Sequence, residues 1–219
     1  MKFTFSTILL FLAFQCVTAA NSADLEKLKL NNSNTQEAPL DLSGADLRAY
    51  DLKGMNLIGA NLRGCNLSGM FLYNIKFDRA NLEGSNFTDA NIENCSFRRA
   101  HMKEARFQNA LISKCKFEDA QLIQAVFIHA TIEFTSLQRA DLDNALFQSS
   151  KIQSVSFYEA EAAKADFNHS KISATTFEHA NLNEAIFDDT SFIGVNFKQA
   201  EWKKASFKRI SQERTNWYW

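Results

Sequence analysis

A large apolar residue recurs every five positions along most of this chain, and that spacing restricts the fold more than any other feature. Residues 80–100, ANLEGSNFTDANIENCSFRRA, carry it at Leu82, Phe87, Ile92 and Phe97. A helix repeats every 3.6 residues and a strand every 2, so a period of five fits neither element alone. The period runs from Leu42 to Phe207, with the small Ala162 as the one exception. The chain is therefore built from one repeated unit.

Within each five-residue unit, a small residue precedes the large one by two positions, as Ala80 precedes Leu82. Residues two apart in extended backbone point the same way, so each unit directs one large and one small side chain inward. Every glycine falls two positions after the large residue: Gly44, Gly54, Gly59, Gly64, Gly69, Gly84 and Gly194. Glycine collects where the backbone needs unusual dihedral angles, so this position is predicted to turn a corner.

Four units make one turn, because the type of large residue repeats every twentieth position. One series is mostly Leu, the series ten residues further on is mostly Ile, and the two between them are mostly Phe. A four-sided coil of twenty residues explains this segregation, since it stacks like on like. We expect Ile112 to lie directly against Ile132.

Stretches such as GADLR, GANLR and DANIE resemble the pentapeptide-repeat family, whose consensus is A(D/N)LXX. The resemblance covers residues 40–209 and implies an all-β fold, the right-handed quadrilateral parallel β-helix. At about 4.8 Å between coils, about 8.5 coils of twenty residues form a rod about 40 Å long.

The first twenty residues, MKFTFSTILLFLAFQCVTAA, have the pattern of a secretory signal peptide. Lys2 precedes an apolar run that ends at Phe14, and small residues follow up to Ala20. The run is too short to span a bilayer comfortably, so no transmembrane segment is expected after residues 1–20 are removed. The pattern predicts a periplasmic or secreted protein.

Both ends of the β-helix are expected to need covers. Residues 21–39 are predicted to form a short capping helix and a linker, with Ser22 as the helix N-cap. The β-helix is predicted to span 40–209, because the period fails after Phe207. In the last segment, 210–219, the residues Trp217, Tyr218 and Trp219 either cover the last coil or form a homodimer contact. We favour the cover; the resemblance implies the dimer contact, since family members commonly associate through their C-terminal ends.

Cys95 and Cys115 are one coil apart, so their Cα atoms are expected at about 4.8 Å. That separation lies within disulfide range, although parallel Cβ vectors leave the Cβ atoms slightly far apart. The pair is either a disulfide or two thiols that serve as small core residues.

Apolar residues replace the usual polar ones at several outward positions around one coil. They are Leu111, Ile123, Val126, Ile128, Phe134 and Leu146. Such a cluster marks a partner surface, although scattered exposed aliphatic residues are also common.

No catalytic or metal motif is present: the chain has no HExxH, no CxxC, no nucleophile elbow and no phosphate loop. We therefore expect no enzyme activity and no cofactor. The favoured function is a non-enzymatic scaffold that binds an unknown protein partner through flat β-helix faces. The resemblance supplies an alternative, a DNA-mimicking inhibitor or protector of DNA gyrase. A formal net charge of −1 and the expected secretion make nucleic acid and its mimicry the weaker choice.

Overall fold

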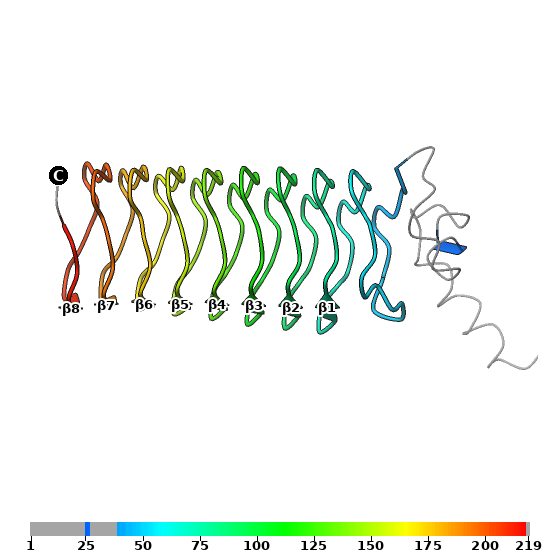
Figure 1. The fold of residues 1–219 in the computed structure, drawn as a ribbon, viewed down its shortest axis with the longest axis horizontal. Helices are drawn as coiled ribbons and strands as arrows, with labels where there is room; N and C mark the ends of the chain where they lie inside the picture. The colour runs from blue at the N-terminus through cyan, green and yellow to red at the C-terminus, as the bar shows by residue number, and fades with distance from the viewer. Residues whose placement is uncertain (1–24, 27–38, 218–219) are drawn as a thin grey trace, which may run out of the picture.

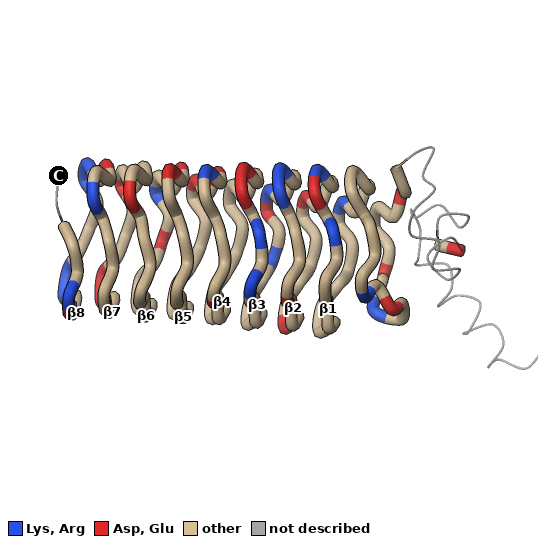
Figure 2. The backbone as a smooth tube through the Cα atoms, viewed as in Figure 1, with Lys and Arg blue, Asp and Glu red and all other residues tan. Residues whose placement is uncertain are grey.

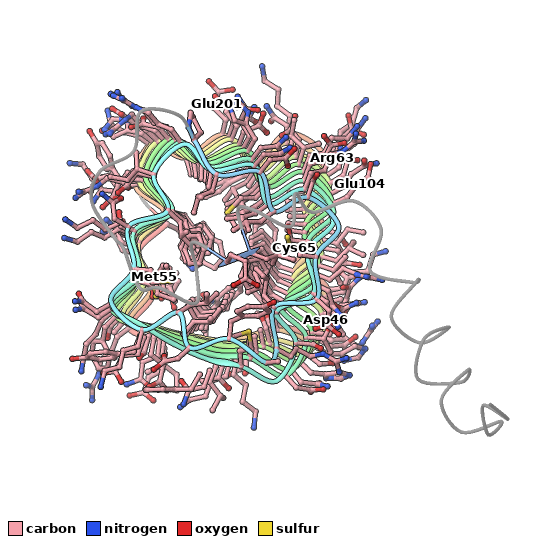
Figure 3. The ribbon with its side chains drawn as sticks, turned by 90° about the vertical axis from the view of Figure 1, so that its right-hand side faces the viewer. Asp46, Met55, Arg63, Cys65, Glu104 and Glu201 are labelled. Carbon is pink, nitrogen blue, oxygen red and sulfur yellow. The ribbon has the colours of Figure 1, made fainter. Side chains whose placement is uncertain are left out.

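The computed structural model describes residues 25–26 and 39–217, and the second of these segments forms a rod of stacked coils (Figure 1). Viewed along the rod, each coil is square (Figure 3). The predicted right-handed quadrilateral parallel β-helix is confirmed. Eight three-residue strands occupy the same place in successive coils: β1 Phe71–Tyr73, β2 Asn91–Glu93, β3 Leu111–Ser113, β4 Thr131–Glu133, β5 Lys151–Gln153, β6 Lys171–Ser173, β7 Ser191–Ile193 and β8 Ser211–Glu213.

Each strand pairs in parallel with the next at an offset of twenty residues, so β1 to β8 form one sheet in chain order. Ile112 lies opposite Ile132, as the sequence predicts. The other three sides are joined by single parallel bridges at the same offset, from the pair Asp41–Asn61 to the pair Asn196–Asn216. Backbone hydrogen bonds between coils therefore run the length of the described rod.

The four sides are named here walls A, B, C and D in chain order. In one coil their inward residues are Leu122, Phe127, Ile132 and Leu137, respectively, and all four are buried. Wall C carries the eight strands. Figure 3 shows Met55 and Cys65 directed into the square, whereas Asp46, Arg63, Glu104 and Glu201 project from it.

Stacked phenylalanines fill much of the core. On wall B, Phe107 and Phe127 lie parallel with their ring centroids 4.8 Å apart, and the same stacking continues to Phe207. Rings of wall D meet those of wall B edge-on, as Phe97 meets Phe87 at 85°. Such aromatic pairs contribute about 0.5–1.5 kcal/mol beyond their burial. The wall D stack is interrupted once, at Leu137.

The predicted corner position has a positive φ at every unit from Gly54 to Arg214. Most of these residues are not glycine, and none is β-branched. The corner closes with a backbone hydrogen bond such as Ala80 N–H to Phe77 C=O, at 3.0 Å. Phe134 is the one phenylalanine at a described corner, with φ 51°, where a side chain with Cβ is disfavoured.

Asn and Asp just before the large residue have a structural use. Their side-chain oxygens accept a hydrogen bond from the N–H two residues further on, as Asn66 Oδ1 does from Ser68 N–H at 3.2 Å. Asp46 does the same for Arg48 N–H. Without this bond, the backbone N–H at the corner would have only water as a hydrogen-bond acceptor. A short Asn or Asp side chain therefore stabilises the turn.

The β-helix extends beyond the predicted boundary at 209. Strand β8 continues wall C, and Asn216 bridges to Asn196 on wall D. The predicted boundary stops short of the end of the rod because Gln212 puts a polar residue at an inward position and interrupts the apolar period. The predicted signal peptide lies outside the described residues, as does all of 21–39 except residues 25, 26 and 39. Of these, Leu25 is helical and packs against the core.

Candidate interaction surface

The surface of the described rod consists of walls and corners, with shallow grooves. Among residues 25–26 and 39–217, no group of three or more His, Cys, Asp or Glu side chains is placed to hold a metal ion. No helix in that part of the chain is long and apolar enough to cross a membrane.

Two of the predicted patch residues stack on wall B. Val126 and Leu146 form a parallel bridge, so their side chains are neighbours on the same outward column, and both are half-buried. Ile186 follows two coils later, after Asp166, and is 37% exposed. The half-buried Ile123 and Ile128 occupy the corners on either side of wall B. Together these residues form an apolar surface on wall B and its two corners.

The other two predicted patch residues lie away from wall B. Leu111 begins β3 on wall C and is 52% exposed. Phe134 lies at the corner between walls C and D and is 56% exposed. The structure thus distributes the six residues around the rod rather than on a single face.

Wall D carries a charged groove. None of its residues belongs to the apolar patch predicted from the sequence. The groove has a volume of about 550 Å³ and lies at the corner between walls D and A. We name it the arginine groove; its charged residues are Arg79, Arg98, Arg99, Arg139, Asp78, Glu118 and Asp119. Ile58 lines one end of it.

Ion pairs order part of this groove. Arg139 holds Asp119 through two hydrogen bonds of 2.8 and 3.3 Å, and Arg98 Nε lies 3.1 Å from Glu118. The hydrogen bond from Arg139 lowers the pKa of Asp119 below its ordinary value. Arg79 makes no ion pair within the described residues.

A second groove of about 200 Å³ adjoins the first on wall D and shares Asp78 and Arg98 with it. It adds Lys76, Lys114 and Lys116. Of these, Lys114 pairs with Glu93 at 3.0 Å. The two grooves together place seven cationic side chains near four carboxylates, although the whole chain has a net charge of −1. Positive charge is therefore concentrated here.

Further along wall D the surface changes to small hydroxyl-bearing residues. We name this region the hydroxyl face; a shallow depression of about 510 Å³ lies over it and is lined by Ser136, Ser154, Ser156, Thr175 and Thr176, with Phe134 at one edge. Its lining contains no charged residue. Figure 2 shows the change along the rod: charged segments cluster in the coils of β1 to β3, and the coils of β4 to β6 are mostly tan on the side facing the viewer.

Cys95 and Cys115 lie inside wall D, behind the charged region, and both are buried free thiols in this structure. The hydrogen bond between the two side chains lowers the pKa of Cys95. Burial raises the pKa of Cys115. The structure holds Cys95 and Cys115 as two separate core thiols.

At the C-terminal end, Trp217 continues the wall D stack, with its ring 4.6 Å from that of Phe197. Trp202 and Phe207 belong to the same last coil, and all three are half-buried. Trp217 therefore serves as an inward residue of the last coil. The predicted Tyr218 and Trp219 lie outside the described residues.

The sequence contained a signal for the arginine groove. Arg79, Arg99 and Arg139 occupy the same corner position in different coils, at offsets that are multiples of twenty. The twenty-residue period, applied to outward positions as well as inward ones, places the three arginines at one corner.

Family models match almost the whole rod. The model described as "Pentapeptide repeat region" matches residues 72–147, 100–177 and 140–217, and that described as "Pentapeptide repeats (8 copies)" matches 41–79. A comparison with curated protein sequences found no significant match.

Solved structures share the fold at low sequence identity. A trypsin-treated form of QnrB1, a plasmid-mediated fluoroquinolone resistance protein, is 17% identical, with a TM-score of 0.52, and the alignment covers 80% of this chain and 90% of that one. HetL, a protein involved in heterocyst differentiation regulation from Nostoc sp. strain PCC 7120, is also 17% identical. Its TM-score is 0.49, with coverage of 88% and 94%. The likeness to QnrB1, at 17% identity, shows a common fold alone.

Proposed function

Because this chain belongs to the pentapeptide-repeat family, we propose that it is a non-enzymatic scaffold that binds a protein partner through its walls. The observation that carries the proposal is the apolar column on wall B, where Val126 and Leu146 stack in register with apolar corners beside them. An apolar surface on a rigid wall favours a protein contact over a small-molecule site, since the wall encloses no deep cavity.

The signal-like N-terminus supports a periplasmic or extracellular site of action as part of the same proposal. In that setting the rod would hold a partner beside its flat walls. The half-buried aromatic residues of the last coil support a second contact, between the C-terminal ends of two copies.

The test is crosslinking from a photoreactive residue at position 123 or 128, in cells that produce the full chain. We expect one crosslinked partner, lost in the double variant Val126→Asp and Leu146→Asp. The matched control is Gln199→Asp, an exposed corner change that also adds negative charge. Crosslinks unchanged by the double variant would rule out wall B as the binding surface.

The gyrase alternative receives no support from the distribution of charge, because the strongest charged feature of wall D is cationic. A DNA mimic presents negative charge. A supercoiling assay with purified protein decides the question, and inhibition or protection of gyrase at micromolar concentration would replace the scaffold proposal.

A further inference from the structure

The arginine groove contains hydrogen-bonding capacity that its own ion pairs do not use. Each guanidinium has five N–H donors in a fixed fork. Arg79 has no ion-pair partner among the described residues, and Arg99 meets Asp119 only at 3.9 Å, since that carboxylate is held more closely by Arg139. The arginine side chains are also exposed, with 64% of the Arg99 side chain accessible. Donors are thus available along the whole groove.

The arginines are spaced along the rod rather than gathered at one point. Arg79, Arg99 and Arg139 share one corner column, and Arg79 is three coils from Arg139. At about 4.8 Å per coil the two lie about 14 Å apart, which is the length of four to five residues of extended peptide at about 3.4 Å per residue. An elongated ligand with several negative charges fits this spacing better than a single small anion.

The carboxylates of the groove distinguish between classes of polyanion. Asp78, Glu118 and Asp119 repel a dense row of phosphates, which have no donor to offer them. An acidic peptide carries backbone N–H donors between its own carboxylates, so it can satisfy groups of both signs. Ile58, 38% exposed at one end, adds an apolar contact for a side chain.

We infer that the arginine groove binds an extended acidic peptide segment of a partner protein, whose carboxylates pair with Arg79, Arg99 and Arg139. The inference rests on the proposed protein-binding function. It specifies the charge and shape of one partner segment that binds the rod. Lys76 and Lys116 on the adjoining groove extend the same positive surface and favour the approach of the acidic segment.

The test measures binding of a fluorescein-labelled hexaglutamate peptide to the full chain by fluorescence anisotropy at low salt. Hexaglutamate should bind and hexaglutamine should not. The double variant Arg79→Gln and Arg99→Gln should weaken binding at least about fivefold, because each guanidinium supplies a charge-assisted hydrogen bond. The matched control, Lys203→Gln with Lys204→Gln, removes two exposed cations from the far end of the rod and should leave binding unchanged.

Thermal unfolding, monitored by circular dichroism, tests whether both double variants are folded. Absence of hexaglutamate binding, or equal loss in the two double variants, would overturn the inference. Tripolyphosphate or oligothymidylate that displaces the peptide at equal charge concentration would also overturn it, in favour of a phosphate ligand. None of these results bears on the wall B crosslink, so failure here and failure of the scaffold proposal are distinguishable.

Discussion

Wall D has two regions that share an interior and differ at the surface. Behind the arginine groove, Phe97 stacks between Phe77 and Phe117, at 4.9 and 4.6 Å. Behind the hydroxyl face, Phe177 stacks between Phe157 and Phe197, at 4.6 and 5.1 Å. The inward residue Leu137 separates the two stacks. The repeat therefore determines the core, while the outward positions are free to vary between a charged and an uncharged surface.

The largest expected effect tests whether the interiors are equivalent. Phe97→Ala and Phe177→Ala each remove a fully buried ring with two stacked neighbours. Each should lower the free energy of unfolding by about 3–5 kcal/mol, through lost transfer energy and the cavity that remains. Urea denaturation measures both. Losses that differ by more than about 2 kcal/mol would show that the two regions differ inside as well as outside.

The second prediction concerns the thiols, which within the described residues occur only in the coils up to Cys115. Burial raises the pKa of Cys65 to about 12, from an ordinary value of 9.0. The folded protein therefore holds this proton more tightly than the unfolded chain. The resulting stability is fully present below pH 9 and is lost as the pH rises toward 12.

Cys65→Ala should flatten the fall in unfolding free energy between pH 8 and pH 10.5. The control is Ser85→Ala in the next coil, where the Ser85 hydroxyl donates to Leu62 C=O at 2.9 Å just as the Cys65 thiol donates to Leu42 C=O at 2.8 Å. Ser85 does not titrate in this range. If Cys65→Ala leaves the pH dependence of the unfolding free energy unchanged, the raised pKa of Cys65 is not its cause.

The third prediction sharpens the comparison at the corner between walls C and D. This corner holds Asn94 and Lys114 beside the charged region and Phe134 beside the hydroxyl face, all at positive φ. Phe134→Asn should raise the free energy of unfolding by about 1 kcal/mol, because Asn tolerates the left-handed region better. Ser154→Asn, at the same corner one coil later, should change it less. A Phe134→Asn variant that is less stable would mean that the exposed ring contributes packing which exceeds its backbone strain.

The smallest expected effect belongs to the ion pairs of the arginine groove, because exposed pairs contribute little and are screened by salt. Arg139→Gln removes the main cause of the lowered pKa of Asp119, so that pKa should rise toward its ordinary value of 3.8. The stability from this pair is present above that value and is lost as the pH falls through the lowered pKa. An NMR titration of the Asp119 carboxyl measures the shift, and an unchanged midpoint would exclude Arg139 as its cause.

The sequence predicted the coil, its register and its corners because each depends on a side-chain type that recurs at a fixed interval. It did not predict the end of the rod, because Gln212 breaks the apolar period while the backbone ladder continues past it. It grouped Leu111 and Phe134 with Val126 by their place in the sequence. In the fold these residues lie on different sides of the rod. Each five-residue unit forms one wall and turns one corner, so residues a few units apart face different directions.

The arginine groove was not predicted for a related reason. Its charged residues are spread along the chain from Asp78 to Arg139, and each one alone is an ordinary charged residue on a solvated surface. They share a site only because the fold stacks two neighbouring outward columns at one corner of the rod. The apolar residues of wall B were found because their type is unusual outside a core.

The offset of twenty residues between paired strands has a consequence for insertions and deletions. Removal of a multiple of twenty residues shortens the rod and leaves each later side chain on its original wall. Removal of five rotates everything downstream by a quarter turn, so that a surface formed from both sides of the cut is divided between two directions. Lineages of this chain can therefore change the length of the rod in whole turns without losing a binding face, whereas a change of one unit separates the parts of any face that spans it.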